Sequence, residues 1–204
     1  MNIFIKYISS QLKKPRGIIG SIVSLAQNII NREQYSSVAS LVDANSDSKI
    51  LDIGFGNGHL IEKLYAKTHA HIYGIDLAKD AIKMAKQKNR KAVKAHRLHL
   101  RVGDCCQLPY KDNTFDAVTS INTIYFWSDT VKGLTEIRRA LKPGKSFYNV
   151  VYTKKKLNTF SFTEEGYKKF KVKEFVEFGK QAGFNDVAVK RFGRGEILVI
   201  VYTK

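Results

Sequence analysis

The chain has 204 residues, of which 44% are hydrophobic and 26% are charged, and its formal net charge is +17. This length and composition exclude a disordered or fibrous chain and predict one globular domain with a full core. The charge indicates an anionic partner, with nucleic acid, an acidic lipid surface and a phosphorylated metabolite as the candidate classes.

Two amphipathic helices are predicted near the start of the chain, because apolar residues recur at helical spacing across residues 3–12 and 18–30. We expect residues 1–38 to form a helical cap and residues 39–204 to form the core of the same domain. Polar residues interrupt the apolar segment, which is too short to cross a bilayer, and no export signal is recognisable. We therefore expect a cytoplasmic protein with no transmembrane segment.

After a polar break at "VDANSDS", the apolar pattern alternates between strands and helices. Strands are expected at "KILDIG", "HIYGI", "LHLRVG", "FDAVTSI" and "SFYNVVYT", and helices at about residues 58–67, 79–95 and 130–141. A turn is expected at "KPGK". This order predicts an α/β fold with a Rossmann-like, doubly wound, seven-stranded and mostly parallel sheet, helices on both faces, and ligands at the carboxyl ends of the strands.

The C-terminal part departs from this alternation. "KEFVEFGKQAG" predicts a helix, and "DVAVKRF" and "EILVIVYT", separated by "GRG", predict a hairpin that adds an antiparallel last strand at the far edge of the sheet. Residues at about 153–170 form an insertion beside the fifth strand, where we expect them to cover the ligand-binding edge.

Three glycines follow the first predicted strand, in "LDIGFGNGHL" at residues 51–60. A dinucleotide fingerprint requires G-x-G-x-x-G, but His59 stands at the third glycine position, and Asp52 precedes the turn. A carboxylate there would repel a pyrophosphate and attract a cationic ligand. Asp76, after the second strand, can accept both hydroxyls of a ribose, and Asp104, after the third, can accept an adenine amine. Ribose, adenine and a cationic amino-acid tail together describe S-adenosylmethionine.

Each of these signals also has a structural explanation. Glycine pairs close ordinary turns between strand and helix, Asp76 precedes a helix where an N-cap is favoured, and Asp104 can close a turn. Their combination on successive strand ends favours a ligand site.

At these residues the chain resembles the class I S-adenosylmethionine-dependent methyltransferases. "LDIGFGNGHL", "YGIDLA", "VGDCCQLPY" and "FDAVTSINTIYFW" look like successive motifs of that family, and "EIRRALKPGKSF" looks like its helix, turn and fifth strand. The order of elements and "LPYKDNTFDAV" are most similar to its small-molecule branch, the methyltransferase type 11 or quinone/sterol methyltransferase-like proteins. The resemblance implies S-adenosyl-L-methionine as cofactor, bound by Asp52, Gly54, Phe55, Gly56, Asn57, Gly58, Asp76, Leu77, Asp104, Cys105 and Asn122.

The resemblance also implies a role for each part of this set. Asp52 and the glycine turn would hold the methionine end, Asp76 the ribose and Asp104 the adenine, with Cys105 as a small apolar wall against the adenine. Lys145 departs from the family pattern, in a turn remote from the chemistry. Cys105 and Cys106 are adjacent, which suits neither an ordinary disulfide nor a metal site, so we interpret both as reduced thiols.

The predicted activity is in-line transfer of the methyl group to a small-molecule acceptor, with the protein supplying alignment and excluding water. The pattern assigns no catalytic residue and requires no general base. Tyr125, in "IYFW", is the first candidate for contact with the acceptor, although packing under the next helix also explains it; Tyr152 and Lys154 are further candidates. We expect the N-terminal helices and the insertion to close over the acceptor.

Two stretches carry most of the positive charge. Residues 79–101 hold nine Lys and Arg against one acid, and residues 138–156 hold seven and no acid. Most of the first stretch is expected at the end of the sheet opposite the ligands, whereas Lys154 to Lys156 follow the fifth strand on the ligand edge and indicate an anionic or membrane-associated acceptor. An RNA methyltransferase is the alternative, although "INTI" lacks an N-P-P-[YF]-like motif; a non-catalytic S-adenosylmethionine-binding protein is a further one.

Overall fold

The computed structural model describes residues 31–204, so the two helices predicted within residues 1–30 lie outside it. The strands are β1 (Lys49–Ile53), β2 (His71–Asp76), β3 (Leu98–Val102), β4 (Phe115–Ile121), β5 (Leu141–Tyr152), β6 (Asp186–Phe192) and β7 (Ile197–Thr203). The α-helices are α3 (Arg32–Leu41), α4 (His59–Thr68), α5 (Lys79–Lys88), α6 (Arg90–Lys94), α7 (Thr130–Ala140), α8 (Lys154–Leu157) and α9 (Val172–Gln181). Short 3-10 helices follow at η1 (Ile124–Phe126), η2 (Ser161–Thr163) and η3 (Gly193–Gly195).

The strands form one sheet in the order β3-β2-β1-β4-β5-β7-β6. Strands β3, β2, β1, β4 and β5 pair in parallel, and β7 is antiparallel to both of its neighbours. This confirms the predicted Rossmann-like α/β fold. The strand order reverses between β1 and β4, and open sheets of this kind bind ligands outside the carboxyl ends of the strands at such a reversal. The loops after β1 and β4 therefore frame the candidate site.

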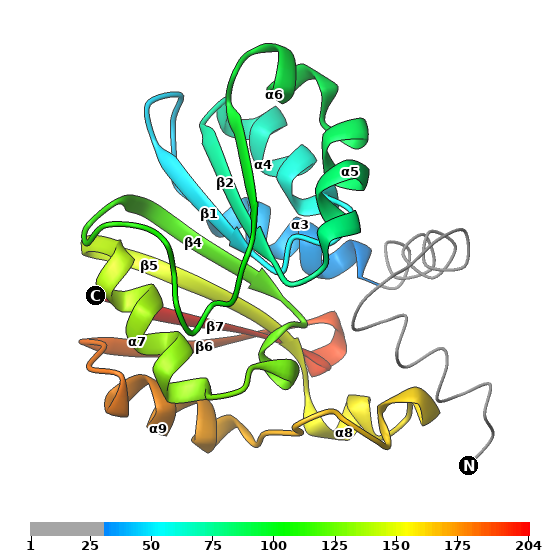
Figure 1. Ribbon diagram of the computed structural model, residues 1–204. Helices are drawn as coiled ribbons and strands as arrows, with labels where there is room; N and C mark the ends of the chain where they lie inside the picture. Colours follow the sequence, from blue (N-terminus) through cyan, green and yellow to red (C-terminus); the bar gives the residue numbers. More distant parts are fainter. Residues whose placement is uncertain (1–30) are drawn as a thin grey trace.

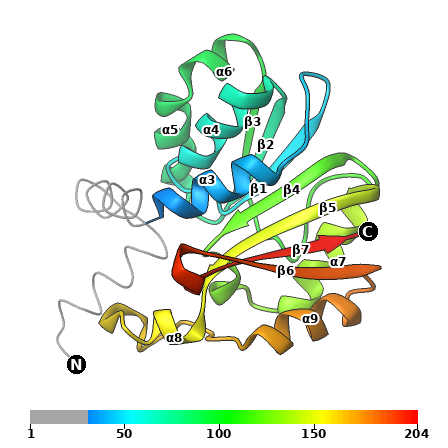
Figure 2. The same ribbon diagram turned by 180° about the vertical axis from the view of Figure 1, so that it is seen from behind.

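The helices cover the two faces of this sheet as a doubly wound fold requires. Figures 1 and 2 show α3, α4 and α5 on one face and α7 and α9 on the other, while α8 lies beyond the end of β5. Fully buried Ile50, Leu51 and Val118 on β1 and β4 form the centre of the core. Among residues 31–204, no helix has the length and apolar content that a membrane crossing requires.

The hairpin differs from the prediction in its order. Strand β7 does not add to the far edge but inserts between β5 and β6, so that β6 is the edge strand. The side chains explain this order: "ILVIVYT" is almost entirely buried and needs a partner on each side, whereas β6 leaves its side chains partly exposed.

Two helix boundaries also differ. The helix predicted over residues 79–95 is broken at Asn89, which leaves helical geometry because its side-chain amide donates to the carbonyls of Gly58 at 3.0 Å and Ala85 at 2.9 Å. The helix predicted to end at residue 141 ends at Ala140, and β5 begins at Leu141. The expected turn therefore falls inside β5, where its register with β4 shifts.

Candidate functional site

The glycine turn after β1 has three left-handed residues, Gly54, Gly56 and Gly58, with φ of +68°, +51° and +77°. A Cβ atom on Gly54 would clash with the side chain of Thr123, and one on Gly58 would lie 2.7 Å from the side chain of Asn89. Beside Gly56, by contrast, no described heavy atom lies within 4 Å of the Cβ position. Packing therefore explains two of the glycines, and the third leaves open space at the carboxyl end of the sheet.

Asp76, the last residue of β2, connects this turn to the next helix. One carboxylate oxygen accepts from the backbone N–H of Gly56 at 2.9 Å, and the other accepts from that of Ala78, at the start of α5, at 2.8 Å. A carboxylate oxygen can accept more than one hydrogen bond, which is the chemistry that ribose hydroxyls require. Asp76 is therefore both a structural link and a candidate ligand group.

Two apolar side chains lie exposed next to Asp76. Leu77 is 59% exposed, and Val102, the β3 residue paired with Asp76, is 50% exposed. Most large apolar side chains of residues 31–204 are buried. Exposed apolar surface beside a convergent carboxylate is typical of a small-molecule site.

Asp52 lies within β1 and is 2% exposed. The Thr119 hydroxyl donates to its Oδ1 at 2.8 Å. Burial raises the pKa of the Asp52 carboxyl to about 7; the bond from Thr119 opposes this shift, and the nearby charge of Asp76 adds to it. Burial also raises the pKa of Tyr35 on α3 to about 12, with a contribution from the charge of Asp52. A cation next to Asp52 would relieve this buried negative charge.

The loop after β3 buries its two thiols. The Asp104 carboxylate accepts from the backbone N–H of Cys106 at 2.9 Å, which closes the turn. Cys105 packs toward α7, with its sulfur 3.4 Å from the Cβ position of Gly133, and burial raises the pKa of its thiol far above the ordinary range. Both cysteines are free. The Cys105 side chain thus forms part of the core behind the loop.

Two further residues of the predicted cofactor set lie on the glycine turn. Phe55 is 5% exposed and packs over Gly74 of β2, so that its side chain belongs to the core. Asn57 accepts from the backbone N–H of His59 at the start of α4. The His59 ring lies edge-on to Tyr35, with ring centres 4.8 Å apart, and burial lowers its pKa.

Asn122, directly after β4, has a left-handed φ of +56° and joins α3 to the sheet. Its amide donates to Oε1 of Gln34 at 2.7 Å, and the Gln34 amide donates back at 3.3 Å. The Asn31 side-chain oxygen accepts from Asn122 at 3.3 Å and from the Tyr152 hydroxyl at 3.1 Å. Asn31 and Gln34 were not predicted from the sequence, because their partner Asn122 lies 91 and 88 residues further along the chain.

Tyr125 and Tyr152, both predicted to contact the acceptor, are buried in this polar network. The Tyr125 hydroxyl accepts from the backbone N–H of Tyr152 at 2.7 Å and donates to Asn122 at 3.2 Å. Burial raises the pKa of Tyr125 well above its ordinary value and that of Tyr152 to about 12. Neither hydroxyl has the pKa of a general base near neutral pH, so a positioning role suits both better. Lys154, the third candidate, is exposed at the start of α8.

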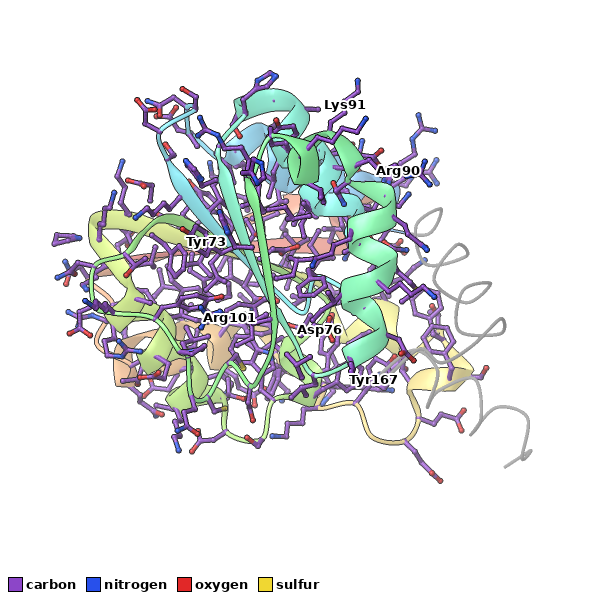
Figure 3. All side chains as sticks on the ribbon, turned by 45° about the horizontal axis from the view of Figure 1, so that its top comes forward. Tyr73, Asp76, Arg90, Lys91, Arg101 and Tyr167 are labelled. Atoms are coloured by element: carbon purple, nitrogen blue, oxygen red, sulfur yellow. The ribbon has the colours of Figure 1, made fainter. Side chains whose placement is uncertain are left out.

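An aromatic cluster connects η1 with residues 160–167. The Tyr167 ring lies 4.6 Å from Phe126 and 5.7 Å from Tyr125, and the Phe160 ring lies 5.2 Å from Phe162. The segment is fixed to η1 by Lys168, whose ammonium donates to the carbonyl of Trp127 at 2.6 Å. In Figure 3, Tyr167 lies at the same end of the molecule as Asp76. The cluster comprises Phe126, Phe160, Phe162 and Tyr167 together with the buried Tyr125 and Tyr152.

Part of the chain matches a known protein family, and the chain is similar to proteins of known description. Residues 51–149 match a family described as methyltransferase domain. The chain is 29% identical over 206 residues to a demethylmenaquinone methyltransferase of Lactiplantibacillus plantarum, covering 87% of this chain and 86% of that protein.

Two solved structures have similar folds. One is a Thermotoga maritima protein described as a SAM-dependent methyltransferase, possible histamine N-methyltransferase, with a TM-score of 0.70, 19% identity, and coverage of 89% of this chain and 94% of that one. The other is phosphoethanolamine N-methyltransferase 2 of Haemonchus contortus in complex with S-adenosyl-L-methionine, with a TM-score of 0.67, 25% identity, and coverage of 78% of this chain and 38% of that one.

Proposed function

We propose that the chain is a class I S-adenosylmethionine-dependent methyltransferase, as its match to a methyltransferase domain and its similarity to a demethylmenaquinone methyltransferase support, and that it binds S-adenosyl-L-methionine at the carboxyl ends of β1, β2 and β3. We further propose that it transfers the methyl group to a small acceptor with an apolar or aromatic body. The open space beside Gly56 is the observation that carries this proposal. Gly54 and Gly58 pack against neighbouring side chains, whereas Gly56 between them does not. A ligand can therefore approach the backbone at Gly56.

The residues around that space suit the three parts of the cofactor. Asp52 would attract the ammonium of the methionine end, Asp76 would accept the ribose hydroxyls, and Asp104 would accept from the adenine amine. The exposed side chains of Leu77 and Val102 would cover the faces of the adenine. Phe55 and Cys105 have buried side chains, so we propose that they contribute their backbone to the site.

When bound, S-adenosyl-L-methionine supplies a methyl group activated by the sulfonium charge. The chain's own task is then to hold the acceptor in line and to exclude water. The amide network of Asn31, Gln34 and Asn122 holds α3 against the end of β4. Tyr125 fixes η1 to β5 through Tyr152. We propose that these contacts position the acceptor-binding surface and that none of them transfers a proton.

The aromatic cluster is the proposed wall for the acceptor. Its rings come from η1, β5 and residues 160–167, and the exposed Lys154 lies on the helix between those segments. Aromatic walls favour flat or apolar ligands, and a lysine at the rim favours an anionic group on them. The similarity to a demethylmenaquinone methyltransferase supports a quinone-like ring as the first acceptor to test.

The experiment is a transfer assay with methyl-labelled S-adenosylmethionine, the full chain, and a panel of quinone-ring acceptors, small amines and RNA. We expect label in a small-ring acceptor and none in RNA. Label only in RNA would favour the alternative of an RNA methyltransferase. Saturable cofactor binding with no transfer to any acceptor would favour a non-catalytic binding protein.

A further inference from the structure

Among residues 31–204, no helix covers one face of β2 and β3, where the loop residue Tyr110 packs with its ring 6.0 Å from that of Tyr73 and 5.8 Å from the Arg101 guanidinium. Parallel strands are usually joined by a helical crossover, but residues 103–114, which connect β3 to β4, form no helix. On the side away from α5, β2 and β3 present Tyr73 and Arg101 (Figure 3). His71 and His99 share this face, and their rings are stacked 5.9 Å apart. We call these four residues the β2–β3 face.

Strand β3 is also an edge of the sheet that residues 31–204 form. The Arg97 carbonyl accepts from Ile72 at 2.7 Å, and the Gly103 N–H donates to Asp76 at 3.0 Å, so these two backbone groups point toward β2. In a parallel ladder alternate residues bond to the same neighbour. The N–H and C=O groups of the residues between them, Leu98, Leu100 and Val102, therefore point away from β2, and no described strand pairs with them.

The charges near this edge are mainly positive. Arg101 is exposed and carries the positive charge of this face. Burial and the neighbouring His71 and Arg101 lower the pKa of His99, which favours its neutral form. The pKa of His71 is lowered by burial and also by the positive charges of Arg97 and Lys49, while the charge of Asp47 raises it. Positive groups therefore outnumber negative ones around His71. Positive side chains on an edge strand disfavour pairing with a second copy of the same chain, because Arg101 would then meet like charges. The same side chains favour an acidic partner.

The aromatic rings on this face pack against one another. His99 stacks on Tyr73 with ring centres 4.6 Å apart, and Tyr73 packs edge-on against Phe115 at 5.4 Å. Single-stranded nucleic acids bind such faces by stacking their bases on accessible rings. A face whose rings stack on each other favours a protein strand instead.

We propose that β3 is the docking edge for an acidic segment of another protein, which adds to the sheet as a further strand. Backbone bonds to Leu98, Leu100 and Val102 would supply the pairing. Because side chains alternate along a strand, every second residue of the partner would lie on the β2–β3 face, where carboxylates would meet the positive charge of Arg101.

The test uses the full chain and a synthetic peptide of about ten residues in which glutamate alternates with valine. We expect binding in a calorimetric titration and slower hydrogen exchange at the amides of Leu98, Leu100 and Val102. A peptide with lysine in place of glutamate should not bind. Arg101→Glu should weaken binding by about tenfold or more, and Arg101→Gln by less.

Arg90→Glu is the matched control, since Arg90 is exposed on α6 and lies away from Arg101 in Figure 3. It makes the same charge change and should leave affinity within about twofold, apart from long-range screening. Equal losses in the two variants, or binding without protection of the three amides, would overturn the proposal. Binding of an oligouridine on this face with no binding of the acidic peptide would also overturn it, as would a dimer whose β3 amides are protected without peptide.

Discussion

Among the proposed ligand carboxylates, Asp52 is the one whose charged form burial disfavours most. It is fully enclosed and holds one bond from Thr119, and burial raises its pKa from 3.8 to about 7. Between these two pH values the folded state binds more protons than the unfolded state, so the free energy of unfolding falls as the pH rises. Burying the charged carboxylate lowers the stability of the fold. The ammonium group of a bound ligand would offset this loss.

Asp52→Asn should therefore separate stability from binding. At pH 8 the free energy of unfolding of the variant should exceed that of the wild type by up to about 4 kcal/mol, because the variant buries no charge. One pKa unit corresponds to about 1.4 kcal/mol. Its affinity for S-adenosylmethionine should fall, and the wild-type gain in affinity between pH 6 and 8 should disappear. Chemical denaturation and calorimetry at both pH values measure these effects; a less stable variant with unchanged affinity would contradict the assignment.

Asp76 combines a structural and a proposed binding role, and two variants can separate them. Asp76→Ala removes the acceptors for Gly56 and Ala78, so it should lower stability and weaken cofactor binding by about 2 to 3 kcal/mol. Asp76→Asn keeps one side-chain oxygen and should lose less stability while still weakening binding. If Asp76→Asn binds the cofactor as the wild type does, the residue serves only the turn and the helix.

At the scale of elements, local patterns predicted most of the sheet. β4 and β6 match their predicted ranges, because alternation and turn residues act within a few positions. The break at Asn89 was not predicted, since it depends on the carbonyl of Gly58, which is 31 residues away. The amide pair of Gln34 and Asn122 spans 88 residues, so no local pattern could reveal that α3 closes one end of the candidate site.

The segment 160–167 should determine acceptor binding and leave the cofactor untouched. Phe162→Ala and Tyr167→Ala should each raise KM for a quinone-ring acceptor several-fold, because each removes an aromatic face from the proposed wall. Calorimetry should show an unchanged Kd for S-adenosylmethionine.

Phe170→Ala is the control for this pair. Phe170 follows the same segment but packs on α9, with its ring 5.5 Å from Phe175 and 5.3 Å from Phe178. This variant should lose stability without a change in KM for the acceptor. An equal rise of KM in all three variants would mean that the segment acts only through its folding.

For the whole molecule, the position of the positive charge distinguishes the acceptor classes. Arg90 and Lys91 lie at the end opposite Asp76 and Tyr167 (Figure 3). At the other end Lys154 and Lys155 are exposed, while Lys156 pairs with Glu196 at 3.0 Å. An RNA substrate would use both ends, whereas a small acceptor would use only the second.

Replacing Lys86, Arg90, Lys91 and Lys94 with Gln should therefore leave methyl transfer nearly unchanged. Replacing Lys154 and Lys155 with Gln should raise KM for an anionic acceptor, because opposite charges attract at the rim, without changing cofactor affinity. Steady-state kinetics at two salt concentrations measures both effects. A large, salt-sensitive loss of RNA binding in the fourfold variant would favour RNA as the substrate.

We propose that the open space beside Gly56 receives S-adenosylmethionine and not a dinucleotide. Calorimetric titration of the full chain with S-adenosylmethionine, its demethylated product and NAD distinguishes the two ligands. We predict saturable binding of the first two and no heat from NAD, since Asp52 disfavours a pyrophosphate and favours a cationic tail. Saturable NAD binding at the same site, with no binding of S-adenosylmethionine, would show that the site holds a dinucleotide instead.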